Sequence, residues 1–340
     1  MSAIFFYSSS VTTTTTNLNS PLQSQLSLSR QLPPTRCTTA AATTNDLRVV
    51  FAAGGTGGHI YPAVAIADEL KMLNPKTQFL FLGTPTGMEA TAVPSSGYRF
   101  ATVPAAPLAR PSRIWDVKLV IQEQNSVPGI ANLVLSLFAH EVFVAFNSTV
   151  ECFWQRNKCV VCGNPVRLSL TKHTSSRTVA RQHFFPKVEV KGKVVLVLGG
   201  SLGANAINIT LLNLYYQMLN EHDYLFIIWQ TGVDAFHEME GLVRNHPRLF
   251  LSPFLHAMDL AYAAADLIVS RAGALTCSEI LTTGKPCILI PSPYVAEGHQ
   301  SKIAYLMAEV AGSKVIMEDE LDSTTLRTAI LKIVAMNALC

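Results

Sequence analysis

Two stretches of this chain each combine an apolar run, a glycine-rich turn and an apolar-periodic segment. The first reads VVFAAGGTGGHIYP over residues 49–62, and the second reads VVLVLGGSLGA over residues 194–204. An apolar run bounded by glycines predicts a buried strand, and the periodic residues after each turn predict a helix that packs back on it. Glycines let loop N–H groups approach a ligand, and the following helix N-terminus favours an anion. Two such units, about 145 residues apart, predict an α/β chain of two doubly wound lobes facing one another.

Length and composition agree with two domains and exclude some partners. The 340 residues exceed what one hydrophobic core usually organises, and 49% of them are hydrophobic. A net charge of +3, without a basic stripe interleaved with aromatics, argues against nucleic acid as a partner. No apolar run reaches the roughly 18 residues of a membrane-spanning helix, so any membrane contact is expected to be peripheral.

Residues 1–45 are expected to lie outside the fold. They contain eighteen Ser or Thr residues and no acidic residue, which is typical of an organelle transit peptide. The shortage of arginine favours a plastid over a mitochondrion. A disordered low-complexity tail is the alternative.

The remaining chain divides into a first lobe over residues 46–170 and a second lobe over residues 171–340. The second lobe alternates strands and helices regularly, which indicates a parallel sheet. In the first lobe, the segment 104–118 holds three prolines and is too short for a parallel crossover with a helix. This lobe is therefore expected to lack a strand and a helix. Residues 173–193 are charged and without clear periodicity, and are expected to link the lobes.

Several function classes are disfavoured by residues that are missing. A dinucleotide-binding fold requires an acidic residue after the second strand of each unit, but Gly83 and Gln230 occupy these positions. NAD binding is therefore disfavoured in both halves. Neither turn continues as Gly-Lys-Ser/Thr, which disfavours a P-loop. No Asp-x-Asp pair lies in a suitable loop, so no divalent metal is expected. The seven scattered cysteines argue against a disulfide framework, and the pair Cys159 and Cys162 is interpreted as buried thiols rather than a metal or redox site.

Polar residues gather at the predicted carboxyl ends of strands, where doubly wound sheets bind ligands. Ser201 lies on the second glycine loop, and Glu279 follows another strand-to-helix turn. Loop amides and a helix dipole would hold a diphosphate, Glu279 could accept both hydroxyls of a ribose, and Arg167 could offset charge on a departing diphosphate. His59 stands at the mouth of the first glycine loop, where it would face a ligand between the lobes. Each residue also has a simpler alternative. Glu279 could be a carboxylate that complements a helix dipole, and Arg167 could be an exposed surface arginine. His59 could be a loop histidine whose hydrogen bonds are made within the protein.

These residues resemble motifs of the MurG family of peptidoglycan N-acetylglucosaminyltransferases. The matching pieces occur in family order over nearly all of residues 47–317: GGTGGH at 54–59, EQN at 123–125, GNPVR at 163–167, GGSLGA at 199–204, RAGALTCSE at 271–279 and HQ at 299–300. The resemblance implies a GT-B fold of two Rossmann-like lobes with a cleft between them. It also implies transfer of N-acetylglucosamine from UDP-N-acetylglucosamine to a lipid-linked muramyl-pentapeptide (lipid I to lipid II), with inversion at the anomeric centre and without a metal or other cofactor.

Carried onto this chain, the resemblance implies a role for each matching position. The first glycine loop would line the cleft, Arg167 and Ser201 would hold the diphosphate, and His59 is the candidate general base. The implied substrate-binding residues are Thr56, Gly57, Gly58, Asn125, Arg167, Ser201, Leu255 (to the uracil through its backbone), Ala274, Leu275, Thr276, Cys277, Ser278, Glu279 and Gln300 (to the N-acetylglucosamine).

The chain also departs from the family pattern. The family motif Gly-Gly-Tyr-x-Ser-Gly-Pro, which helps to bind the lipid pyrophosphate, is missing at the shortened crossover, and Ile303 replaces a usual Asn. The chain also ends before the family's final helices. We therefore expect an enzyme of the chloroplast stroma, peripheral to the inner envelope or thylakoid membrane, with acceptor binding affected. The alternatives are a galactolipid-type transferase that uses UDP-galactose, or an impaired isoform that only binds a nucleotide sugar.

Overall fold

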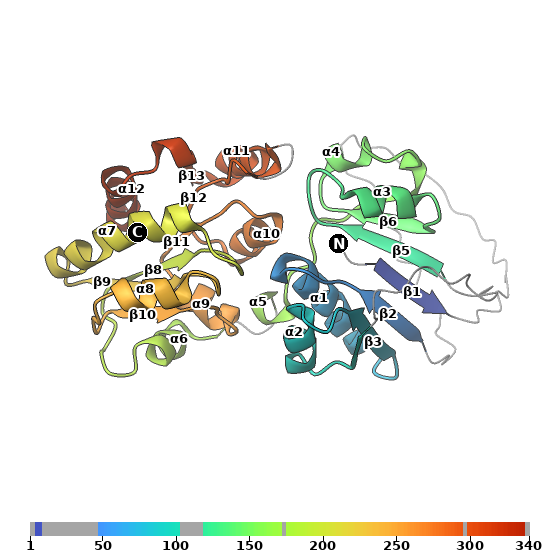
Figure 1. The fold of residues 1–340 in the computed structure, drawn as a ribbon, viewed down its shortest axis with the longest axis horizontal. Coiled ribbons are helices and arrows are strands. Elements are labelled where there is room, and N and C mark those ends of the chain that lie inside the picture. Colours follow the sequence, from blue (N-terminus) through green and yellow to red (C-terminus); the bar gives the residue numbers. More distant parts are fainter. Residues whose placement is uncertain (1–3, 9–46, 103–117, 172–174, 295–297, 337–340) are drawn as a thin grey trace, which may run out of the picture.

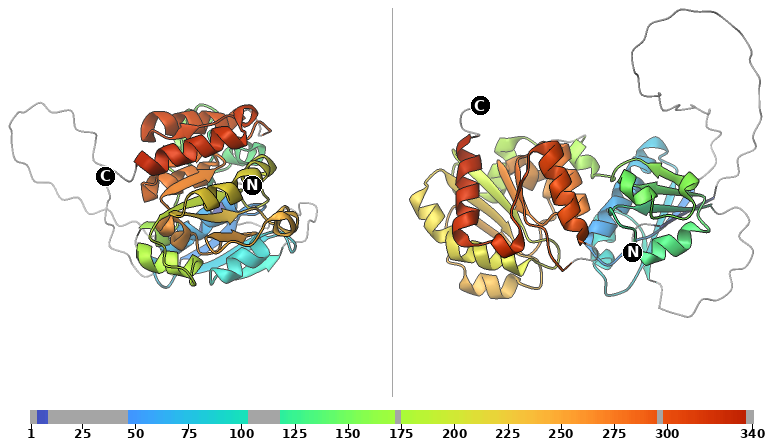
Figure 2. Two further views of the ribbon diagram at one scale, coloured as in Figure 1. Left: turned by 90° about the vertical axis from the view of Figure 1, so that its left-hand side faces the viewer. Right: turned by 90° about the horizontal axis from the view of Figure 1, so that it is seen from above.

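The computed structural model describes residues 4–8, 47–102, 118–171, 175–294 and 298–336, with the backbone alone for 4–8. Two sheets, each covered by helices, form two lobes side by side (Figure 1). The same two lobes are seen from the side and from above in Figure 2. The predicted α/β architecture of two Rossmann-like lobes is therefore confirmed.

The first lobe is built on a seven-stranded sheet with the order β4-β3-β2-β1-β5-β6-β7. Val49 and Phe51 of β2 alternate with more exposed residues and face a core with the helices α1 and α2. Ile121 of β5 and Val142 of β6 face the opposite core, against α3. The elements are β1 (Ile4–Ser8), β2 (Arg48–Ala52), α1 (Gly57–Leu73), β3 (Gln78–Gly83), α2 (Glu89–Ser95), β4 (Phe100–Thr102), β5 (Lys118–Glu123), α3 (Ile130–Ser136), β6 (Glu141–Val144), α4 (Asn147–Val150), η1 (Arg156–Lys158) and β7 (Cys159–Val161).

The strand β1 corrects the expectation that residues 1–45 contribute nothing to the fold. It lies between β2 and β5 and pairs antiparallel with both, with Phe6 opposite Val50 on one side and Leu119 on the other. The other neighbouring strands of this sheet are parallel. The short run Ile-Phe-Phe-Tyr is rich in strand-forming residues, and β2 and β5 offer it two rows of backbone groups. The shortened crossover falls mostly on residues 103–117, outside the described residues.

The second lobe has a six-stranded parallel sheet with the order β10-β9-β8-β11-β12-β13. Strands β8 and β9 are buried on both faces, which explains their continuous apolar sequences. The elements are α5 (Leu168–Thr171), α6 (Arg177–Phe184), β8 (Lys193–Leu198), α7 (Asn205–Glu221), β9 (Leu225–Gln230), α8 (Phe236–Leu242), β10 (Leu249–Ser252), α9 (Met258–Ala264), β11 (Leu267–Ser270), α10 (Ala274–Thr283), β12 (Cys287–Leu289), α11 (His299–Ala311), β13 (Lys314–Val315), η3 (Glu318–Glu320) and α12 (Ser323–Met336).

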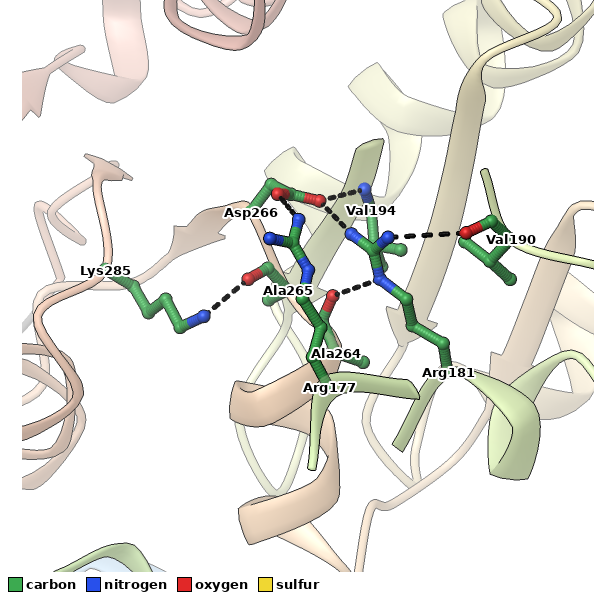
Figure 3. A network of polar contacts seen from close by, with 8 residues as sticks. All are labelled: Arg177, Arg181, Val190, Val194, Ala264, Ala265, Asp266 and Lys285. Atoms are coloured by element: carbon green, nitrogen blue, oxygen red, sulfur yellow. Dashed lines mark hydrogen bonds and ion pairs between the residues drawn. The ribbon is translucent and has the colours of Figure 1, made fainter. Parts of the chain in front are cut away.

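Residues 173–193 are not merely a link, because α6 packs into the second lobe. Ala180 and Phe184 of α6 are part of the core of this lobe, and α6 contacts α9. Figure 3 shows why its charged residues belong there: Arg177 and Arg181 both pair with the buried carboxylate of Asp266. The second oxygen of Asp266 also accepts the backbone N–H of Val194 at 2.7 Å. The charged residues of this segment therefore hold α6 against the start of β8 and β11.

Three expectations about surface and metal chemistry can be compared with the described residues. Cys162 is exposed and Cys159 is half-buried, so the interpretation of this pair as buried thiols is wrong. Burial still raises the pKa of both thiols. Within the described ranges, no three His, Cys, Asp or Glu side chains gather as a metal site would need. No helix in the described part of the chain is both long and apolar enough to cross a bilayer.

Candidate active site

A cleft of about 860 Å³ lies where the two lobes meet. The first lobe contributes the first turn of α1 to its wall, and the second lobe contributes the loops that follow β8, β11 and β12. These are carboxyl ends of strands, as predicted for a doubly wound sheet. The predicted site residues that line the cleft are Thr56, Gly57, Gly58, Arg167, Ser201, Leu255, Leu275, Thr276, Glu279 and Gln300.

The second glycine loop needs its glycines for two separate reasons. Gly200 and Gly203 have φ values of 81° and 119°, in the left-handed region that favours glycine. A Cβ on Gly203 would also lie 2.8 Å from the carbonyl oxygen of Thr231 on the neighbouring loop. The loop therefore places Ser201 and its backbone in the cleft wall, just before α7 begins at Asn205. Such a loop suits the oxygens of a phosphate.

Glu279 is buried on α10, with 3% of its surface exposed, yet it still lines the cleft. Its Oε2 accepts a hydrogen bond from the hydroxyl of Tyr262 at 3.0 Å. Its Oε1 lies 3.2 Å from Nε of Arg167, but the two atoms are not aligned as a hydrogen bond. Burial raises the pKa of Glu279, while the charge of Arg167 and the hydrogen bond from Tyr262 act in the opposite direction. Oε1 therefore keeps its capacity to accept a hydrogen bond from a ligand in the cleft.

Arg167 connects the two lobes. It follows β7 of the first lobe, pairs with Glu279 of the second, and stacks on the ring of Tyr61 from α1 at 3.8 Å. Next to it, Asn164 Nδ2 donates to the Ser278 hydroxyl of α10 at 3.2 Å. Burial raises the pKa of Tyr61. The guanidinium is thus held at the cleft by an aromatic face on one side and a carboxylate on the other.

His59 lies in the first turn of α1, next to Gly58 of the cleft wall. Its Nδ1 is 3.1 Å from the hydroxyl oxygen of Thr56. Burial lowers the pKa of His59 to about 4, so the imidazole is neutral at pH 7. A neutral imidazole with one nitrogen oriented by a neighbour can accept a proton at the other.

Five predicted residues do not line the cleft: His59, which lies beside it, and four others. Asn125 donates its backbone N–H and its side-chain amide to Glu123 Oε1, and so braces the loop after β5. Ala274 opens α10, and Ser278 faces Asn164. Cys277 is buried, and burial raises the pKa of its thiol to about 12.

Tyr61 and Glu318 also line the cleft, and neither was predicted from the sequence as a site residue. Tyr61 lies behind Arg167, and Glu318 forms an ion pair of 2.5 Å with Arg271. The sequence signal that could have identified Tyr61 is its aromatic side chain two positions after His59. Glu318 comes from a short helix that only the fold brings to the cleft.

Comparison with known proteins agrees with this architecture. The N-terminal domain model of glycosyltransferase family 28 matches residues 49–120, and its C-terminal domain model matches residues 194–339. A crystal structure of Acinetobacter baumannii MurG is 25% identical, with a TM-score of 0.54, covering 83% of this chain and 89% of that one. WaaG, a glycosyltransferase involved in lipopolysaccharide biosynthesis, shares the fold at 14% identity, with a TM-score of 0.50 over 84% of this chain and 89% of that one. Two lobes around such a cleft define a GT-B glycosyltransferase.

Sequence relatives narrow this class. A protein of Flavobacterium psychrophilum is 36% identical over 81% of this chain and 86% of its own length. One of Caldicellulosiruptor saccharolyticus is 31% identical over 86% of this chain and 91% of its own. Both are named UDP-N-acetylglucosamine–N-acetylmuramyl-(pentapeptide) pyrophosphoryl-undecaprenol N-acetylglucosamine transferase. The chain belongs to the MurG family.

Proposed function

We propose that this chain transfers N-acetylglucosamine from UDP-N-acetylglucosamine to a lipid-linked N-acetylmuramyl-pentapeptide, with inversion at the anomeric carbon. The observation that carries the proposal is Glu279, a buried carboxylate with one hydrogen-bonded oxygen and one unsatisfied oxygen at the cleft. Such an oxygen can accept hydrogen bonds from the hydroxyls of a ribose. The MurG relatives, which carry this activity in their names, support the same reading.

The cleft supplies a partner for each part of the donor. The loop with Ser201 and the N-terminus of α10 offer backbone N–H groups to the diphosphate, and Arg167 adds a positive charge. Leu255 lies at the wall where the uracil would meet its backbone. Gln300 is held there by the backbone N–H of Ser292, which donates to Gln300 Oε1 at 2.9 Å. This leaves the Gln300 Nε2 to donate to the N-acetylglucosamine.

The transfer itself breaks the bond between the anomeric carbon and the UDP oxygen while the acceptor hydroxyl forms a new bond on the opposite face. His59, neutral at pH 7, takes the proton of that hydroxyl. Arg167 and the loop amides stabilise the negative charge that develops on the departing diphosphate. Proton, sugar and leaving group are thus each assigned to a residue that lines the cleft or, for His59, lies beside it.

We further propose that the enzyme acts in a plastid, in the stroma, against the inner envelope or thylakoid membrane. Support comes from the Ser/Thr-rich, acid-poor composition of residues 1–45 and from the membrane lipid that the acceptor would carry. Expression of residues 1–45 fused to a fluorescent protein tests this proposal. Accumulation of the fusion outside plastids would contradict it.

A second function is favoured by one observation. Strand β1 occupies the position beside β2 where a parallel strand would follow in a doubly wound lobe, and it arrives from the leader with the opposite direction. The sheet of the proposed acceptor-binding lobe therefore differs from a fully parallel one. This difference favours a function in which the protein binds the nucleotide sugar without transferring it.

One assay separates these functions. The full chain is incubated with a lipid I analogue and either UDP-N-acetylglucosamine or UDP-galactose, and lipid product and released UDP are measured. Product from UDP-N-acetylglucosamine supports the transferase, and a preference for UDP-galactose points to a galactolipid-type enzyme. Donor binding by calorimetry without any product identifies the binding-only isoform.

A further inference from the structure

The first lobe contains a second cavity, separate from the cleft. Its volume is about 450 Å³, and it lies between α1 and the sheet strands β2, β5 and β6. Among the described residues, none that lines this cavity also lines the cleft. Its walls are mostly aliphatic or aromatic, with Leu47, Val49, Ile66, Leu70, Val120 and Phe143 among them.

Gln122 brings a polar side chain to this mostly apolar lining, which also includes Asn164. Gln122 follows Val120 by two positions on β5, so both side chains point to the α1 face of the sheet. Gln122 is only 2% exposed, and its Nε2 donates to Asn164 Oδ1 at 3.4 Å. Its Oε1 has no hydrogen-bond partner among the described residues. A buried carbonyl oxygen without a donor is costly, so a ligand that supplies one is favoured.

The size and lining of the cavity are those of a ligand site rather than of a packing defect. Voids in well-packed cores rarely exceed a water molecule, whereas small-molecule sites span about 300–1,000 Å³ with mainly apolar walls and a few polar groups. The described lining residues carry no charged side chain, so an ionised ligand would lose its hydration without compensation.

We propose that this cavity binds a neutral, mainly apolar molecule that carries one hydroxyl group. The apolar body fills the space between α1 and the sheet, and the hydroxyl donates to Gln122 Oε1. The site does not depend on the proposed transferase activity, because none of its described lining residues also lines the cleft.

The test compares binding of 2-naphthol and naphthalene to the full chain by fluorescence titration. These probes share their apolar body and differ by one hydroxyl. Three variants are used: Gln122→Leu removes the acceptor, Ile66→Trp fills the cavity, and Leu73→Trp adds the same ring to an exposed position of α1 as a control. Binding of UDP-N-acetylglucosamine reports whether each variant keeps its fold.

We expect 2-naphthol to bind wild type roughly five- to tenfold more tightly than naphthalene, as one buried hydrogen bond implies. Gln122→Leu should remove this preference and Ile66→Trp should abolish binding of both probes, while Leu73→Trp behaves as wild type. Equal affinity for the two probes in wild type would overturn the proposal. So would binding of 2-naphthol that persists in a folded Ile66→Trp variant.

Discussion

Arg167 is held between the ring of Tyr61 and the carboxylate of Glu279, and so joins α1 of one lobe to α10 of the other. Its guanidinium lies 3.8 Å from the ring centroid, and its Nε lies 3.2 Å from Glu279 Oε1. The cation that would meet a donor diphosphate is therefore positioned before the donor arrives. The contact also places the proposed ribose acceptor and the proposed diphosphate ligand side by side.

The first prediction concerns Glu279. Replacing it as Glu279→Gln removes the charge that strengthens hydrogen bonds from the ribose hydroxyls and leaves Arg167 without its ion-pair partner. We expect the Kd for UDP-N-acetylglucosamine, measured by calorimetry, to rise roughly 10- to 100-fold, because hydrogen bonds to a charged group are lost. Tyr262→Phe is the matched control, because it removes the hydrogen bond to Oε2 and keeps the carboxylate. Unchanged donor affinity in Glu279→Gln would contradict the ribose assignment.

The second prediction concerns the aromatic support of Arg167. Tyr61→Leu removes the cation–π contact, whereas Tyr61→Phe keeps the ring. We expect Tyr61→Leu to weaken donor binding about three- to tenfold and Tyr61→Phe to leave it near wild type. If both variants weaken binding equally, the hydroxyl matters and the stacking does not.

The third prediction tests His59 as the base. His59→Gln keeps a polar group of similar size but cannot accept the acceptor proton at neutral pH. In a chain that transfers sugar, kcat should fall roughly 10²- to 10⁴-fold, with donor affinity little changed. Steady-state kinetics together with calorimetry separate the two effects. A kcat within a few fold of wild type would assign the base elsewhere.

The fourth prediction follows from the lowered pKa of the same residue. Between pH 6.5 and about 4, the unfolded chain protonates His59 while the folded chain does not. The unfolded state binds more protons in this window, so the free energy of unfolding falls as pH falls through it. This effect of His59 lowers the free energy of unfolding by up to about 3 kcal/mol across the window. The loss is smaller to the extent that water reaches the ring. Urea unfolding at pH 7, 5.5 and 4.5 measures the slope, and His59→Gln should flatten it; parallel slopes for both proteins would rule the effect out.

The fifth prediction addresses β1. Phe6→Pro removes a backbone donor and restricts φ in a strand that is paired on both sides. We expect a loss of about 1–3 kcal/mol in the free energy of unfolding, measured by urea denaturation of the full chain. Ser10→Pro changes the same leader outside β1 and serves as the control. Identical midpoints for the two variants would show that β1 does not stabilise the lobe.

Much of this architecture is local in the sequence and was predictable. The glycine turns after apolar runs placed Ser201 and Thr56 at carboxyl ends of strands, and there they line one cleft. Glu279 was identified by its position in a strand-to-helix turn. These predictions succeed because strand, turn and helix signals lie within about fifteen residues of one another.

What was missed depends on contacts between distant segments. The stacking of Tyr61 on Arg167 joins residues of different elements, and no local pattern announces it. The charged residues of α6 suggested a link between the lobes, because their partner Asp266 is some 85 residues away in the sequence. The antiparallel pairing of β1 likewise depends on two edges formed by β2 and β5, neither adjacent in sequence.

If residues 1–45 are the transit peptide proposed above, the position of β1 would make import and folding compete for the same residues. A leader whose Ile4–Ser8 segment is already paired with β2 and β5 is no longer an extended chain that import machinery can thread. Conversely, a peptidase that removed the leader would leave two facing strand edges in the middle of the sheet. Those edges accept an extended segment from any chain that offers one, including the leader of a second copy. The order of the two events, cleavage before folding or folding before cleavage, would then decide which molecule accumulates.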